Sequence, residues 1–95
     1  ASRKRWRERA LMALYTIELC GRLADRAGAA LTLELDAASC SVADLRAALA
    51  AAHPSLAADM ANARVRACVD EVIVKDTFMV AAGQAIAFFP PVSGG

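Results

Sequence analysis

The 95-residue sequence has a single histidine, no closely spaced pair of cysteines and no long apolar run. No stretch approaches the roughly 18 consecutive apolar residues that a membrane-spanning helix needs. The basic start is not followed by the apolar segment and the small-residue cleavage site of a secretory signal. We therefore expect one small domain in the cytoplasm, without a membrane partner.

The cysteine pattern excludes the common cysteine-based sites. Cys20, Cys40 and Cys68 lie 20 and 28 residues apart, which matches no zinc motif, and an odd number argues against a framework of disulfides. We expect no metal site, and three small, partly buried thiols in a reducing compartment.

Other catalytic constellations are also missing. The only histidine, His53, precedes a proline at the expected end of a helix, where it caps the last carbonyls more readily than it acts as a general base. The glycines do not gather into a phosphate-binding loop, and Asp70-Glu71 has the pattern of a turn or a strand edge. The body of the domain is therefore predicted to bind no cofactor and to carry no catalytic group.

Charge is divided unevenly along the chain. Residues 1–10 contain five basic residues and one acidic residue, a net charge of +4, whereas residues 11–95 contain six basic and nine acidic residues, a net charge of −3. The basic segment could contact nucleic acid or another anionic surface. We favour a solvated, disordered extension over residues 1–12, or residues that precede the native start, and expect no nucleic-acid partner.

Two regions of alternating hydrophobicity predict a β-hairpin at the start of the domain. Residues 13–20 place Tyr15, Ile17 and Leu19 on one face, and residues 31–35 place three leucines on one face. A period of two is typical of half-buried strands. Residues 21–28 between them are expected to form one short helical turn that stops at a glycine.

A helix is predicted to follow the hairpin. Ser41 can cap its first turn, Asp44 suits its positive end, and alanine fills most positions up to His53-Pro54. Residues 56–60 are expected to add another turn. Strands are then predicted over 65–69, 72–74 and 85–89, with residues 78–80 crossing towards a turn at 82–84. The predicted order is β-β-α-β-β, an α+β domain over residues 13–89 with one main helix covering a small mixed sheet.

The C-terminus carries the strongest functional signal. The last predicted strand runs directly into Pro90-Pro91, which cannot donate ladder hydrogen bonds and stiffen the exit. The tail over 90–95 continues through Val92 and Ser93 to Gly94 and Gly95, and when extended it reaches roughly 15–20 Å. Because glycines lack Cβ atoms, such an end can enter a tunnel and present its terminal carboxylate there.

The ending FFPPVSGG resembles that of the ubiquitin-like sulfur carriers, a β-grasp family that includes the small subunit of molybdopterin synthase and a carrier of the thiazole pathway. The segments IELCGRLADRAG, SVADLRAALAAAHP and VRACVDEVIV fit the order of elements in this family, so the resemblance covers residues 13–95. Residues 1–11 have no counterpart in the usual pattern. Cys20 stands where a larger apolar side chain is common.

The resemblance implies a mechanism in which Gly95 is the reactive residue and Gly94 admits it to the partner's site. An adenylating enzyme related to the ubiquitin activators would use ATP and magnesium to activate the Gly95 carboxylate, and a persulfide donor would supply sulfur for a thiocarboxylate. The large subunit of molybdopterin synthase would then transfer this sulfur to cyclic pyranopterin monophosphate, in a heterotetramer. The resemblance also places Ile73 and Phe89 on an apolar docking patch beside the tail residues Pro90, Pro91, Val92 and Ser93.

Three alternatives remain open at this point. The chain could serve the same carrier chemistry in another pathway, such as thiazole or cysteine formation. It could be a ubiquitin-like modifier joined through Gly95 to protein lysines, or a binding module whose Gly-Gly tail is incidental. For Ile73 and Phe89, the alternative to a place on the docking patch is ordinary packing in the core.

Overall fold

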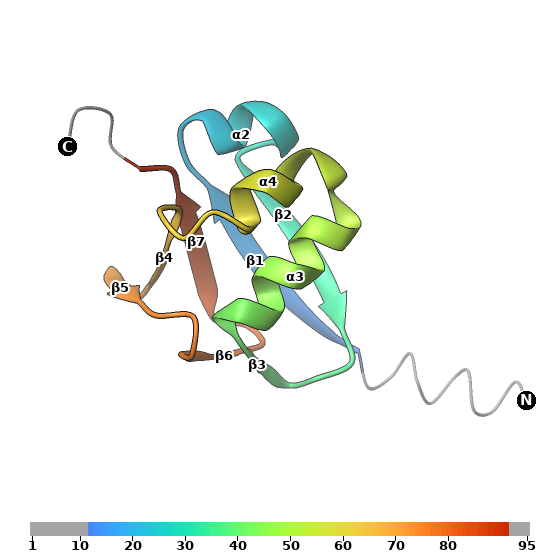
Figure 1. Cartoon of the computed structure of the whole chain (residues 1–95). Helices are drawn as coiled ribbons and strands as arrows, with labels where there is room; N and C mark the ends of the chain where they lie inside the picture. Colours follow the sequence, from blue (N-terminus) through green and yellow to red (C-terminus); the bar gives the residue numbers. More distant parts are fainter. Residues whose placement is uncertain (1–11, 92–95) are drawn as a thin grey trace, which may run out of the picture.

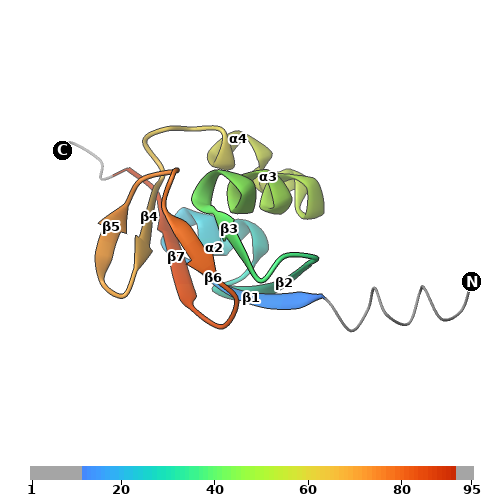
Figure 2. The same cartoon turned by 90° about the horizontal axis from the view of Figure 1, so that it is seen from below.

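A computed structural model describes residues 12–91 of the chain. Its main element is a five-stranded mixed sheet in the order β2-β1-β7-β4-β5, in which β1 and β7 run parallel at the centre and the other pairs are antiparallel. Helices α3 and α4 lie across one face of this sheet, and the other face is open (Figures 1 and 2). This is the β-grasp arrangement that the sequence predicts.

The predicted hairpin is confirmed. Strand β1 (Ala13–Leu19) pairs with β2 (Ala30–Leu35), and helix α2 (Arg22–Ala27) forms the connection between them. Because side chains alternate between the two faces along β1, Tyr15, Ile17 and Leu19 all point toward the helices, and each is 3% exposed or less.

The main helix, α3 (Val42–Ala52), begins as its sequence predicts. The Ser41 hydroxyl accepts a hydrogen bond from the Asp44 amide at 3.1 Å, and the Asp44 carboxylate accepts one from the Ser41 amide at 3.4 Å. This capping box satisfies two amides that would otherwise lack partners at the helix start. The helix ends at His53, whose backbone amide donates to the Leu49 carbonyl, and a short 3-10 helix η1 (Pro54–Leu56) and α4 (Ala57–Met60) follow.

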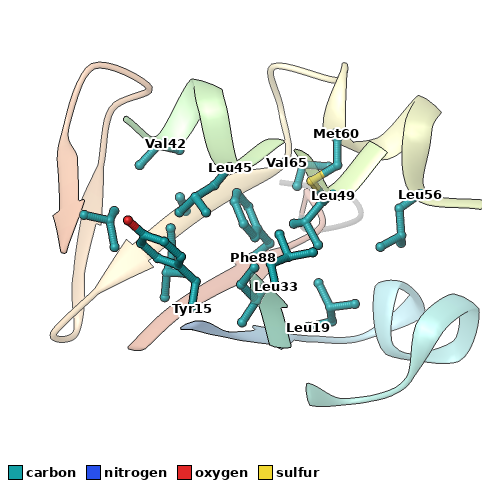
Figure 3. Close-up of a cluster of buried hydrophobic side chains, with 14 of the residues drawn as sticks. Tyr15, Leu19, Leu33, Val42, Leu45, Leu49, Leu56, Met60, Val65 and Phe88 are labelled. Atoms are coloured by element: carbon teal, nitrogen blue, oxygen red, sulfur yellow. The ribbon is translucent and has the colours of Figure 1, made fainter. Parts of the chain in front are cut away.

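The core lies between α3, α4 and the covered face of the sheet (Figure 3). Phe88 and Tyr15 are its largest fully buried side chains. The Tyr15 hydroxyl donates a hydrogen bond of 2.7 Å to the Ala37 carbonyl, which supplies the partner that a buried phenol requires.

Strands β4 (Arg66–Val69), β5 (Val72–Val74) and β7 (Ala85–Phe89) complete the main sheet. Asp70 and Glu71 join β4 to β5 with positive φ angles of 51° and 67°, as expected for a two-residue hairpin turn that follows the twist of the strands. The predicted turn role of this pair is therefore confirmed.

The structure adds a second sheet to the predicted order. Strand β3 (Ser39–Ser41) pairs antiparallel with β6 (Met79–Ala81), beside the start of α3. Each strand buries only its central residue, Cys40 in β3 and Val80 in β6. Within residues 12–91, no helix is long and apolar enough to cross a membrane.

One buried charge holds several elements together. Arg46 of α3 is 9% exposed, and its Nε lies 2.9 Å from Asp76 Oδ1 in the loop after β5. The rest of its guanidinium donates to the carbonyls of Met60, Asn62 and Val65 and lies 5.4 Å from the centre of the Phe88 ring. Burying this group requires such a full set of acceptors, since an unpaired buried cation is strongly destabilising.

Candidate functional site

The tail leaves the domain from a central strand. Strand β7 is paired along both sides, with β1 and with β4, up to its last residues. Phe88 is fully buried in the core, and the next residue, Phe89, pairs with Arg66 on the open face. Because both neighbours and the core hold β7, the direction in which Pro90 leaves the sheet is fixed by the fold.

Gly21 and Pro90 make a close contact at this exit. Gly21 has a φ angle of 56°, and a Cβ atom built on it would lie 3.2 Å from Pro90 Cγ and 3.5 Å from Pro90 Cδ. Glycine is favoured here for two reasons. Its backbone angles lie in a region that residues with side chains rarely adopt, and a Cβ atom would crowd the ring of Pro90. Apart from a glycine directly after a predicted strand, no sequence pattern indicates this role.

Cys20 also belongs to this exit. Its backbone amide donates a hydrogen bond of 3.0 Å to the Phe88 carbonyl, and its own carbonyl accepts from the Leu23 amide at 3.2 Å. The segment 20–23 therefore connects the end of β7 to the start of α2. The Cys20 side chain is exposed, which corrects the expectation that all three thiols are partly buried.

The other two thiols are less accessible. Cys68 is half-buried on the open face of the sheet, and Cys40 of β3 is buried in the core. Burial raises the pKa of the Cys40 thiol, and burial also raises the pKa of the adjoining Tyr15 phenol. Both groups are therefore held in their neutral forms, which suits a structural role better than a nucleophilic one.

The predicted docking residues lie on the same, open face of the sheet. Ile73 is 59% exposed and pairs with Cys68 across β4 and β5. Phe89 of β7 is half-buried. It pairs with Arg66, whereas Ile73 pairs with Cys68, and these two partners are two residues apart on β4. Because residues two apart on a strand point to the same face of the sheet, Phe89 and Ile73 share the open face. The structure thus separates the two neighbouring phenylalanines, with Phe88 in the core and Phe89 outside it.

The remaining predicted site residues divide into two groups. Pro90 and Pro91 are half-buried directly after β7. Val92, Ser93, Gly94 and Gly95 lie outside the described residues. Within residues 12–91, no group of three or more histidine, cysteine or acidic side chains is placed to hold a metal ion.

The topology, the open sheet face and the tail that follows the central strand define the class of the protein as β-grasp, or ubiquitin-like. The model of the ThiS family matches residues 17–95, and the chain belongs to this family. It is therefore a ubiquitin-like sulfur carrier of the ThiS type, as its resemblance to that family predicted.

Solved structures show the same fold. Small archaeal modifier protein 1 from Haloferax volcanii is 27% identical, with a TM-score of 0.73 over 86% of this chain and 99% of that chain. A protein from Pyrococcus furiosus, described as molybdopterin converting factor subunit 1, is 20% identical, with a TM-score of 0.69 over 84% and 99%. Small archaeal modifier protein 1 from Methanosarcina acetivorans is 19% identical, with a TM-score of 0.69 over 88% and 98%. No curated protein gave a significant match.

Proposed function

We propose that the chain is the small, sulfur-carrying subunit of molybdopterin synthase and that the Gly95 carboxylate is its reactive group. The observation that supports the proposal is the exit of the tail, where Pro90 directly follows a strand paired on both sides and leaves no room for a side chain at Gly21. A carrier needs such an exit, because its reactive end must reach a partner's site at a constant distance and direction.

The chemistry divides between this chain and its partners. A carboxylate is a poor electrophile, so a ubiquitin-activator-like enzyme would first adenylate Gly95 with ATP and magnesium. The terminal sulfur of a persulfide donor would then attack the acyl-adenylate and displace AMP, and a thiol would cleave the S–S bond of the resulting acyl disulfide, which leaves a thiocarboxylate on Gly95. The chain itself would bind no cofactor. The thiocarboxylate would deliver its sulfur to cyclic pyranopterin monophosphate in the large subunit, within a heterotetramer in the cytoplasm.

The open face is the proposed docking surface. Ile73 and Phe89 lie on it, and both would contact the large subunit next to the tunnel that receives residues 90–95. Exposed apolar side chains of this kind supply the anchors of many protein interfaces. Catalytic pocket residues would belong mainly to the large subunit, because Cys40 and Tyr15 in the body of this domain are buried and neutral.

Intact-mass measurement tests the proposal. The chain is incubated with ATP, magnesium, an activating enzyme and a persulfide source, and we expect the mass gain of one oxygen exchanged for one sulfur at Gly95. The charged carrier, mixed with the large subunit and cyclic pyranopterin monophosphate, should then yield the dithiolene. Sulfur gain without dithiolene formation would contradict the molybdopterin assignment and favour a thiazole or cysteine pathway.

A second candidate is a protein modifier, because structures of small archaeal modifier protein 1 share this fold over nearly their whole length. In that case the activated Gly95 would form an isopeptide bond with a lysine. Covalent adducts on partner proteins, detected after the same incubation, would favour this function. A chain that binds its partners equally well without residues 90–95 would instead be a plain binding module.

A further inference from the structure

Strand β5 forms one edge of the main sheet. It is paired with β4 on one side only, and among residues 12–91 Figures 1 and 2 show no other element beyond it. Its three residues are all β-branched and apolar, and Val72 and Ile73 are 61% and 59% exposed. Because these two neighbours point to opposite faces of the sheet, the edge is apolar on both faces. A bare edge of this kind is a template on which another strand can pair.

The backbone of Ile73 is directed outward from the sheet. Val69 and Val72 flank the two-residue turn of the β4–β5 hairpin, and the two residues that flank such a turn exchange hydrogen bonds with each other. Hydrogen-bonded and non-hydrogen-bonded pairs alternate along an antiparallel ladder, so the next pair, Cys68 with Ile73, is of the second kind. The amide and the carbonyl of Ile73 therefore point away from β4, where a strand outside the sheet can bond to them.

The sequence of this edge is complementary to itself. Residues 71–75 read Glu-Val-Ile-Val-Lys. When two copies are paired antiparallel about Ile73, each Ile73 lies opposite the other, Val72 lies opposite Val74, and Glu71 lies opposite Lys75. The two salt bridges among residues 12–91 involve neither Glu71 nor Lys75, so both charges are available for this contact. Opposite charges that face each other across two strands stabilise the pairing and fix its register.

The neighbouring charges are compatible with the same register. It brings Asp70 of one copy opposite Asp76 of the other, but Asp76 lies in the turn after β5, and its Oδ1 is 2.9 Å from Arg46 Nε. The cation thus neutralises one member of this pair. The other edge of the sheet, β2, has a single charged residue, Glu34, and no cation. The complementary pattern therefore belongs to β5 and not to β2.

We propose that two copies of the free chain form a two-fold symmetric dimer by antiparallel pairing of their β5 strands about Ile73. The two main sheets then become one continuous sheet. Two hydrogen bonds between the Ile73 backbones, contacts between Val72 and Val74, and two Glu71–Lys75 pairs hold the copies together. The dimer is weak and concentration-dependent, because the contact covers one short strand on each copy. Ile73 is also a proposed docking residue, so the dimer must dissociate before the large subunit binds; this consequence alone rests on the proposed function.

Sedimentation velocity of the full chain alone tests the dimer, so the result is independent of any partner and of the proposed function. The buffer contains a reductant, because the exposed Cys20 could otherwise cross-link two copies. Between roughly 10 μM and roughly 1 mM, a range that detects weak association, we expect an equilibrium of monomer and dimer. Larger species should be missing, because a two-fold contact is closed. A monomer at every concentration, or association that continues beyond the dimer, would overturn the proposal.

Charge-exchange variants locate the contact. Glu71→Lys and Lys75→Glu should each raise the dissociation constant of the dimer about ten-fold or more, since two-fold symmetry turns both attractive pairs into repulsive ones. The double variant Glu71→Lys, Lys75→Glu restores both pairs, and it should dimerise as the native chain does. Circular dichroism verifies that each variant is folded.

Glu34→Lys is the matched control, because it makes the same change of charge at the edge strand β2. It should leave the dissociation constant unchanged. If it weakens the dimer as much as Glu71→Lys does, or if the folded double variant stays monomeric, the pairing of two β5 strands is wrong.

Discussion

Gly21 and Pro90 are 69 positions apart in the sequence, yet a Cβ atom on Gly21 would lie 3.2 Å from the proline Cγ. A Cβ atom this close to Pro90 would force one of the two segments to shift, so the first loop of the domain and the start of the tail fit together only with glycine at position 21. The hydrogen bond from the Cys20 amide to the Phe88 carbonyl holds the same loop at the end of β7. Together these contacts fix the origin of the tail to the core.

Gly21→Ala should therefore impair both folding stability and sulfur acceptance. The φ angle of 56° makes a side chain unfavourable, and we expect the free energy of unfolding to fall by about 1–3 kcal/mol. Displacement of Pro90 should in addition slow the transfer of sulfur to the folded protein. Urea unfolding and single-turnover mass spectrometry measure the two effects separately.

Gly28→Ala is the control for this variant. Gly28 also has a positive φ angle, of 93°, but a Cβ atom there would meet nothing within 4 Å. It should lower stability by backbone strain and leave the transfer rate of the folded protein unchanged. If the two variants slow transfer equally, the contact with Pro90 has no role in positioning the tail.

Docking should depend on Phe89 and Ile73. We expect Phe89→Ala or Ile73→Ala to weaken binding of the large subunit by about 1–2 kcal/mol or more, measured by calorimetry, while the domain remains folded. Thr32→Ala, on the same face at the edge strand β2, should leave affinity unchanged. Unaltered affinity in Phe89→Ala would remove this residue from the interface.

The neighbouring phenylalanine provides a contrast. Phe88 is fully buried, and Phe88→Ala should cost about 3–5 kcal/mol of stability. Phe89→Ala should cost far less. If both variants unfold the domain to the same extent, Phe89 is a core residue, and its placement on a docking surface is wrong.

Much of this fold follows from local sequence patterns. The β1–β2 hairpin is visible in the alternation around Tyr15 and Ile17, and the start of α3 in the spacing of Ser41 and Asp44. Strands β3 and β6 were not predicted as strands, because three-residue segments with one buried side chain each have no measurable periodicity. Their pairing depends on long-range contacts that the local pattern does not contain.

The candidate site could be predicted from the sequence only in part. The tail and the exposed Ile73 followed from the resemblance to sulfur carriers, but the contact of Gly21 with Pro90 joins distant segments and has no local signature. The burial of Arg46 was also invisible, since arginine is ordinarily a surface residue. Only the fold brings the three backbone carbonyls and Asp76 together around its guanidinium.

Alkaline pH should destabilise the domain through Cys40 and Tyr15. Burial raises the pKa of both groups in the folded state, so the unfolded state loses its protons first as pH rises. The stability that these two groups contribute is fully present below their unfolded pKa values, about 8.5 for cysteine and about 10 for tyrosine. It is lost progressively as the pH rises above those values.

Urea unfolding between pH 7.5 and pH 10.5 measures this loss. In Cys40→Ala, the free energy of unfolding should fall less steeply over the lower part of this pH range. In Tyr15→Phe, it should fall less steeply above about pH 10. Each variant starts from a lower stability than the native chain. Exposed Cys20 is the control site, and Cys20→Ala should leave the decline as it is in the native chain. A stability that is constant over this range would show that neither group is held neutral by the fold.

The length of the tail should matter more than its composition. Deleting Gly95 shortens the reach by about 3 Å, and transfer requires reacting atoms within roughly 3–3.5 Å, so we expect the rate of sulfur acceptance to fall by orders of magnitude. Stability and docking should be preserved, because β7 ends at Phe89 and Gly95 has no side chain to bury. Adding one alanine after Gly95 should be equally damaging, since it moves the carboxylate and places a side chain in the tunnel. Mass spectrometry should show the oxygen-to-sulfur exchange on the native chain and on neither variant. If the extended chain still gains sulfur and supports dithiolene formation, the terminal carboxylate of Gly95 is not the group that carries it.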